Sequence, residues 1–176
     1  MNKFLIVIDM QNDFVTGSLG SDNAILASSN IKKLLQTSEY DYVIFTQDTH
    51  HEDYLENTME GKKLPVPHCI QGTEGWEIVP ELAEEFGSPF TIQKETFGYT
   101  NWESTLIEYF NFSAAEDTID IVGVCTDICV VSNALILKAL FPNTPITVIQ
   151  DCVAGTSISN NLAAITTMRA CHIDIK

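Results

Sequence analysis

Short apolar runs alternate with longer amphipathic stretches along the whole chain, and this alternation constrains the fold more than any other feature. The apolar runs are rich in β-branched residues, as in strands that helices cover on both faces. They occupy residues 4–8, 42–46, 90–93, 119–124, 146–149 and 173–175. Stretches with a helical period occupy residues 21–36, 80–86, 101–109, 127–140 and 159–170. The repetition predicts a Rossmann-like α/β fold, a three-layer α/β/α sandwich with a mostly parallel six-stranded sheet.

Length, charge and cysteine content narrow the class of protein. The 176 residues suffice for one apolar core and contain no repeat or linker, so we expect a single domain over residues 1–176. The net charge of −15 disfavours nucleic acids and membrane surfaces as partners, and it says little about a small neutral substrate. The first apolar run is too short for a signal peptide, so we expect a cytoplasmic protein. The odd number of cysteines, five, argues against a disulfide framework in such a compartment. We also expect a homo-oligomer.

Polar residues follow four of the predicted strands. They are Asp9, Asp48, Lys94 and the segment 125–129. Ligands of open parallel sheets bind beyond the carboxyl ends of the strands. Because these four groups converge on one edge of the sheet, this edge is the expected site.

Cys129 is the candidate nucleophile. Residues 123–129 run from a buried strand into a helix, where unpaired backbone N–H groups and the helix dipole favour a thiolate. We therefore expect a lowered pKa for Cys129, whereas Cys125 lies in the turn before the helix. Two other interpretations stay open: both cysteines are core residues, or they form a redox pair. Without a second pair they make a poor zinc site.

Asp9 and Lys94 are the candidate partners of this thiol. Asp9 ends a run of buried aliphatic residues, so partial desolvation raises its pKa and suits it to accept a proton. Its alternative role is to cap the following loop. Lys94 ends the third strand, where its ammonium group would favour both a thiolate and a carboxylate. Its alternative role is a solvated ion pair with Glu95.

A metal site is the third candidate feature. In an extended chain, Asp48 and His50 point to the same side. A distant His68 and a further carboxylate could complete a site of oxygen and nitrogen ligands that suits Zn, Mn or Fe. A solvated polar loop is the alternative, since residues 48–76 show no strong periodicity.

Together, these motifs resemble the isochorismatase-like cysteine hydrolases, and within them the nicotinamidase/pyrazinamidase branch. The resemblance covers nearly the whole chain and is most specific at residues 7–14 and 123–130. It implies Cys129 as nucleophile, Asp9 as general base and acid, and Lys94 as the third member of the triad. It also implies a cis peptide bond before Cys125 and an oxyanion hole formed by the backbone N–H groups of Cys125 and Cys129. The presence of Cys129 points away from the isochorismate-cleaving branch.

The same resemblance implies a bound metal. Asp48, His50 and His68 match three of its ligands. For the remaining ligand we choose Glu60, with Glu56 and His51 as alternatives.

The resemblance also suggests how a substrate ring would be held. Residues 64–67 lack the aromatic residue that family members often carry just before the later histidine. Phe14, Phe97 and Tyr99 are therefore the expected ring contacts.

The expected function is that of an amidohydrolase for a small carboxamide, first of all nicotinamide, which it would convert to nicotinate and ammonia through a cysteine thioester. It would use one divalent transition metal and no organic cofactor. A metal-free hydrolase of N-carbamoyl or ureido compounds is the alternative within the same superfamily. Outside it, a thiol redox protein and a noncatalytic binding module remain open, because a fold alone does not prove activity.

Overall fold

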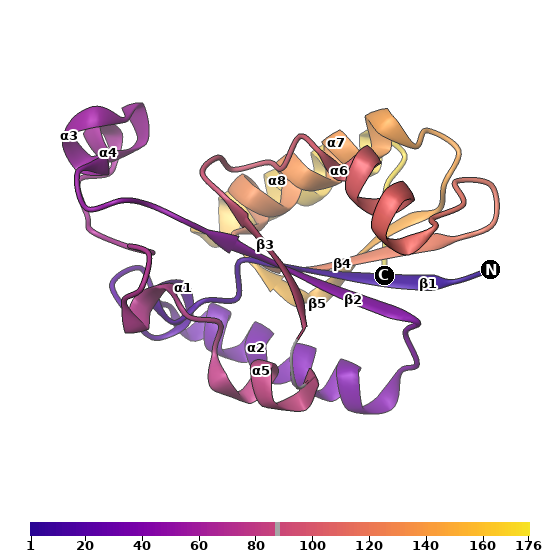
Figure 1. The fold of residues 1–176 in the computed structure, drawn as a ribbon, viewed down its shortest axis with the longest axis horizontal. Coiled ribbons are helices and arrows are strands. Elements are labelled where there is room, and N and C mark those ends of the chain that lie inside the picture. The colour runs from indigo at the N-terminus through magenta and orange to yellow at the C-terminus, as the bar shows by residue number, and fades with distance from the viewer. Residues whose placement is uncertain (87–88) are drawn as a thin grey trace.

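A parallel sheet of six strands forms the centre of the computed structural model, which describes residues 1–86 and 89–176 (Figure 1). The strand order is β3-β2-β1-β4-β5-β6, and every pairing is parallel. The strands are β1 Lys3–Ile8, β2 Tyr42–Asp48, β3 Phe90–Lys94, β4 Thr118–Val124, β5 Ile146–Ala154 and β6 Asp174–Ile175. The predicted sheet is confirmed, although β5 runs five residues beyond its predicted end at residue 149.

Helices cover both faces of the sheet (Figure 1). Helices α1 (Asn12–Val15), α2 (Asp22–Thr37) and α5 (Pro80–Phe86) lie on one face. Helices α6 (Trp102–Ser104), α7 (Val131–Leu140) and α8 (Ile158–Ala170) lie on the other. The side chains of β1 alternate between the two apolar clusters, with Phe4, Ile6 and Ile8 in one and Leu5 and Val7 in the other. This two-sided burial explains the continuous apolar runs and confirms the three-layer α/β/α fold.

Two predicted helices contain a wider turn than expected. Residues 101–109 form α6 followed by a π-helical segment, η2 (Thr105–Tyr109). Residues 127–140 form a π-helical segment, η3 (Thr126–Val130), before α7 begins. Such wide turns occur often at functional sites, and η3 contains Cys129.

The segment between β2 and α5 is more regular than its sequence suggests. It contains the short helices α3 (Tyr54–Asn57) and α4 (Met59–Lys63) and the 3₁₀ turn η1 (Glu74–Trp76). Figure 1 shows α3 and α4 beyond the end of the sheet. Gly61 permits their close approach, since a Cβ atom there would lie 2.4 Å from the Cα atom of Leu55. Helices this short have little periodicity, so the apolar pattern could not reveal them.

Within residues 1–86 and 89–176, no helix has the length and apolar character that crossing a membrane requires.

Candidate active site

The carboxyl ends of four neighbouring strands bring the predicted site residues together. Asp48 and Lys94 end β2 and β3 and stand opposite each other in the sheet register. Asp9 directly follows β1, and Cys125 directly follows β4. The edge predicted from the order of strands and helices is therefore the edge at which these side chains meet.

Asp9 is held rigidly in the interior. Its backbone has a positive φ of 49°, and its Oδ1 atom accepts a hydrogen bond of 2.6 Å from the Thr46 hydroxyl. The Asp9 backbone N–H donates to the same hydroxyl oxygen at 3.1 Å. Burial raises the pKa of the Asp9 carboxyl, and the charge of Lys94 offsets part of that rise. Asp9 is thus a fixed carboxylate with raised proton affinity.

The Lys94 ammonium lies among two carboxyl groups and a thiol of the site. Its Nζ atom lies 2.6 Å from Oδ2 of Asp9, 3.5 Å from Oδ1 of Asp48 and 3.7 Å from the sulfur of Cys129. Burial alone would lower the pKa of Lys94, but the neighbouring Asp9, Cys129 and Asp48 outweigh it and raise the pKa. The solvated ion pair with Glu95 is wrong, since Lys94 is buried and Glu95 lies near His51 instead.

The surroundings of Cys129 differ from the expectation of a lowered pKa. Burial raises the pKa of this thiol well above its usual range, and Asp9 raises it further, while Lys94 acts in the opposite direction. The prediction from the helix start is wrong because burial disfavours the charged thiolate, and the negative charge of Asp9 adds to this effect. The thiol therefore needs a base beside it.

Cys125 occupies the turn before η3. The peptide bond from Val124 to Cys125 is cis, as the resemblance implied. Burial raises the pKa of the Cys125 thiol to about 12, so this side chain stays protonated near neutral pH. Both Cys125 and Cys129 line the same cavity, which encloses about 830 Å³.

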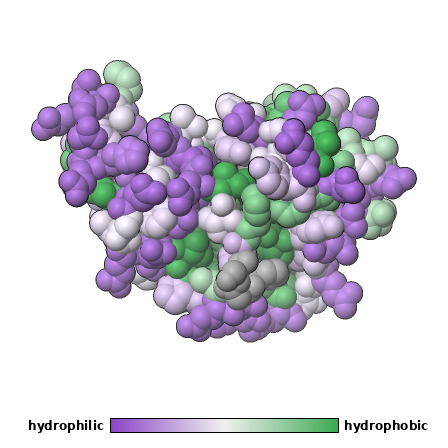
Figure 2. Space-filling model, viewed as in Figure 1, coloured by the Kyte–Doolittle hydropathy of each residue, from purple (hydrophilic) through white to green (hydrophobic). Residues whose placement is uncertain are grey.

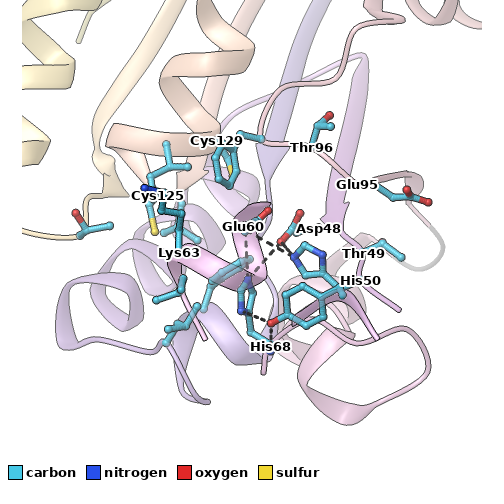
Figure 3. A pocket seen from close by; sticks show the side chains of 18 of the residues that line it. Asp48, Thr49, His50, Glu60, Lys63, His68, Glu95, Thr96, Cys125 and Cys129 are labelled. Atoms are coloured by element: carbon cyan, nitrogen blue, oxygen red, sulfur yellow. Dashed lines mark hydrogen bonds and ion pairs between the residues drawn. The ribbon is translucent and has the colours of Figure 1, made fainter. Parts of the chain in front are cut away.

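Four side chains beside Lys94 and Cys129 point toward one another (Figure 3). They belong to Asp48, His50, Glu60 and His68, and their ligand atoms lie within 4.8 Å of one another. The Nε2 atom of His50 lies 3.0 Å from Asp48 Oδ2 and 3.7 Å from Glu60 Oε1. The Nε2 atom of His68 lies 3.6 Å from Glu60 Oε1. The two alternative ligands, Glu56 and His51, are exposed and lie outside the group.

This four-residue group fits a divalent metal. Asp48 Oδ1 and His50 Nε2 are buried and have no hydrogen-bond partner within the part of the chain that the structure describes. Nδ1 of His68 lies 2.8 Å from the Val66 carbonyl oxygen. Because a hydrogen bond there makes Nδ1 the donor, Nε2 keeps its lone pair toward the group. Two carboxylates and two imidazoles form a ligand set that suits transition metals such as zinc.

The predicted ring contacts are only partly at the cavity. Phe14 and Phe97 line it, and Phe14 also packs against the His68 ring with centroids 5.6 Å apart. Tyr99 does not line it: its ring packs against Trp102, and its hydroxyl oxygen lies 3.0 Å from that of Thr105. Tyr99 is therefore a packing residue, because its loop turns the ring toward α6.

Comparison with known proteins decides the family. The profile of the isochorismatase domain matches residues 3–175, which is almost the whole chain. This chain belongs to the isochorismatase family.

Named relatives of this isochorismatase-family protein include several amidases. The nicotinamidase/pyrazinamidase of Mycobacterium tuberculosis is 29% identical over 184 residues, with 98% of this chain and 97% of the relative covered. The pyrazinamidase/nicotinamidase of Streptococcus mutans has a similar solved structure, with a TM-score of 0.81, 30% identity and 99% of each chain covered. The structure of the Pyrococcus horikoshii pyrazinamidase, solved in complex with zinc, has a TM-score of 0.76 and 25% identity, covering 100% of this chain and 99% of the other.

Sequence reasoning missed residues that hold the site of this isochorismatase-family protein in place. The Gln11 side chain donates to the Asp48 carbonyl oxygen and accepts from the Asp48 N–H, each at 2.8 Å. The Asn133 amide donates to the Cys129 carbonyl oxygen at 2.8 Å. Asn133 follows Cys129 by one helical turn in a mostly apolar helix, and this spacing was the available signal.

Proposed function

We propose that this protein is a cysteine amidohydrolase that converts nicotinamide to nicotinate and ammonia. The observation that carries the proposal is the position of the Lys94 ammonium between the Asp9 carboxylate at 2.6 Å and the Cys129 sulfur at 3.7 Å. The names of the relatives support the choice of substrate.

In the first proposed step, Asp9 takes the Cys129 thiol proton as the sulfur attacks the carboxamide carbon. The backbone N–H groups of Cys125 and Cys129 stabilise the oxyanion. Asp9 returns the proton to the departing nitrogen, so that ammonia leaves and an acyl thioester remains. Asp9 next takes a proton from water, whose oxygen attacks the thioester; nicotinate is released and the thiol is restored.

The charges of the site fit these steps. Lys94 keeps a positive charge beside Asp9, and this charge stabilises the carboxylate that accepts the proton. The thiol holds its proton at rest because burial raises the pKa of Cys129. The proton therefore moves only when the sulfur attacks, which avoids a standing thiolate that oxidants could reach.

One divalent metal (Zn, Mn or Fe) is part of the proposal, and no organic cofactor is needed. Asp48, His50, Glu60 and His68 would hold it. When bound, such a metal supplies a Lewis-acidic charge that can anchor a pyridine nitrogen. Phe14 and Phe97 line the same cavity and would contact the ring.

The alternatives are less well supported. The four-residue metal group argues against a metal-free hydrolase of N-carbamoyl or ureido compounds. A redox pair of Cys125 and Cys129 would give no role to the contacts of Lys94 with Asp9 and Cys129. A noncatalytic binding module would not need a buried acid, ammonium and thiol together. The cytoplasmic location and the homo-oligomer stay predictions.

A panel assay of ammonia release tests the proposal. Purified protein would be offered nicotinamide, pyrazinamide, an N-carbamoyl amino acid and a ureido acid, each with and without a chelator. We expect turnover of the two ring carboxamides and its loss on chelation. Turnover of the N-carbamoyl or ureido compound alone, unaffected by chelation, would favour the metal-free alternative.

A further inference from the structure

Three large apolar side chains gather at the rim of the catalytic cavity although they are exposed. Met59 is 69% exposed, Phe97 42% and Leu64 38%. All three also line the cavity that contains Cys129. Scattered apolar side chains on a surface need no explanation, but a group at one rim marks a binding surface. The space-filling view shows hydrophobic residues in the recess beside the otherwise hydrophilic α3 and α4 (Figure 2).

The rim is fixed by the residues that build the site. Met59 precedes the metal-group residue Glu60 in α4, and the backbone N–H of Leu64 donates to the Glu60 carbonyl oxygen at 2.8 Å. The carbonyl oxygen of Phe97 accepts a hydrogen bond of 3.0 Å from Asn133, the same side chain that donates to the Cys129 carbonyl oxygen. The apolar rim therefore keeps its place relative to both the metal group and the nucleophile.

The cavity is also larger than a single-ring amide requires. Its volume of about 830 Å³ lies toward the upper end of the range for sites that enclose drug-sized ligands, roughly 300–1,000 Å³. A pyridine carboxamide with its nitrogen toward Asp48 and His50 and its amide at Cys129 would fill only part of this space. The ring carbon meta to both anchored positions points away from both, so a group attached there has the remaining volume open to it.

We infer that the preferred substrates are primary carboxamides whose pyridine ring carries an apolar substituent meta to both the nitrogen and the carboxamide. This inference rests on the proposed function and names the substrate class within it. The substituent lies against Met59, Leu64 and Phe97. When it binds, it shields the exposed surface of these three side chains from water. Since this contact is the same before and during the reaction, it acts on KM and leaves kcat unchanged.

Steady-state kinetics with nicotinamide and its phenyl derivative, 5-phenylnicotinamide, test the inference. We expect the substituted amide to have a KM about tenfold below that for nicotinamide, because extra apolar contact in a pocket has effects of this size. Met59→Gln should raise the KM for the phenyl derivative several-fold more than the KM for nicotinamide. Leu162→Gln is the matched control, since Leu162 is 56% exposed in α8 and does not line the cavity. This control should change the kinetics of neither substrate.

The outcomes separate the inference from the proposed function. Turnover of nicotinamide with a higher KM for the phenyl derivative would overturn the inference and leave the proposed function intact. Equal effects of Met59→Gln on the two amides would also overturn it. No turnover of either amide by the metal-loaded protein would overturn the proposed function, and the inference with it.

Discussion

At the scale of single residues, the reactivity of Cys129 depends on its neighbours. Burial holds the pKa of its thiol well above the usual range, and the Lys94 ammonium at 3.7 Å offsets only part of that effect. Asp9 is buried as well, and its pKa is also raised. Two proton-binding groups of raised pKa beside one fixed ammonium suit a site in which a proton moves between the two groups.

Replacing each cysteine distinguishes a side-chain role from a backbone role. Cys129→Ala should lower kcat by roughly four orders of magnitude or more, because it removes the proposed nucleophile. Cys125→Ala should keep kcat within about tenfold, since the proposed oxyanion hole uses only its backbone N–H. Ammonia release at saturating nicotinamide measures both. An inactive Cys125 variant beside an active Cys129 variant would reverse the assignment.

Asp9→Asn tests the proposed role of Asp9 as the proton carrier. The amide has nearly the same shape as the carboxylate but cannot accept the thiol proton, so kcat should fall by about 10²- to 10⁴-fold. Metal content and circular dichroism should match the wild type, which shows that the fold is kept. Near-native turnover in this variant would eliminate the proposed mechanism.

At the scale of elements, the close approach of β1 and β4 sets the position of Asp9 relative to Cys125. Gly123 in β4 pairs with Ile8 in β1 and has a φ of +117°. A Cβ atom at Gly123 would lie 2.1 Å from the Ile8 carbonyl oxygen. Only glycine permits both this backbone conformation and this contact.

Gly123→Ala should therefore destabilise the protein strongly. We expect a loss of about 3 kcal/mol or more in the free energy of unfolding, because backbone strain and a clash with backbone add together. Gly72→Ala is the matched control: its φ is +82°, but nothing lies within 4 Å of the added Cβ atom. It should cost only about 1 kcal/mol, from strain alone. Urea unfolding measures both, and equal losses would show that the contact with Ile8 is unimportant.

Asp117 links the starts of β1 and β4, and its hydrogen bonds should make the free energy of unfolding depend on pH. Its buried carboxylate accepts hydrogen bonds from the backbone N–H groups of Asn2 and Ser113. Burial raises the pKa of Asp117, but these hydrogen bonds outweigh burial and lower the pKa overall. The resulting stabilisation is fully present above the ordinary carboxyl pKa of about 3.9 and is lost as pH falls through the lower pKa of the folded state.

Asp117→Asn should thus cost about 1–3 kcal/mol at pH 7, and the difference from wild type should shrink as the pH falls below about 4. Urea unfolding at several pH values measures this difference. Glu108→Gln, an exposed change of the same kind, serves as the control and should have little effect. A difference between Asp117→Asn and wild type that stays constant down to acid pH would contradict the assignment.

At the scale of the whole molecule, the metal group depends on segments that are distant in sequence. Asp48 ends β2, Glu60 lies in α4, and His68 follows twenty residues after Asp48. The Tyr54 ring stacks on the His50 ring with centroids 4.1 Å apart, and the Tyr54 hydroxyl oxygen lies 3.0 Å from Nδ1 of His68. Tyr54 in α3 therefore orients both histidines.

Metal content tests this arrangement. We expect about one transition-metal ion per chain by elemental analysis, and its loss in His50→Ala, since a site of few ligands tolerates no missing imidazole. Glu60→Ala should lose metal and Glu56→Ala should not, because only Glu60 belongs to the group. Loss of the metal should raise KM as well as lower kcat. Full metal in Glu60→Ala would exclude Glu60 as a ligand.

The sequence by itself determined the layers and the edge at which the site lies. Apolar runs and helical stretches report burial of local segments, and the rule for parallel strands then places Asp9, Asp48, Lys94 and Cys125 at one edge. These features need only periodicity and chain order.

Only the tertiary structure decided which side chains meet at the site and how burial shifts their pKa values. It placed Glu60, and not Glu56 or His51, beside Asp48, His50 and His68. It also turned Tyr99 away from the cavity and raised the pKa of Cys129 where the helix start predicted a lowered one. Contacts between distant segments determine where a side chain in a short helix or loop lies. They also determine how far water is excluded from a thiol. The apolar periodicity of one segment does not indicate such contacts.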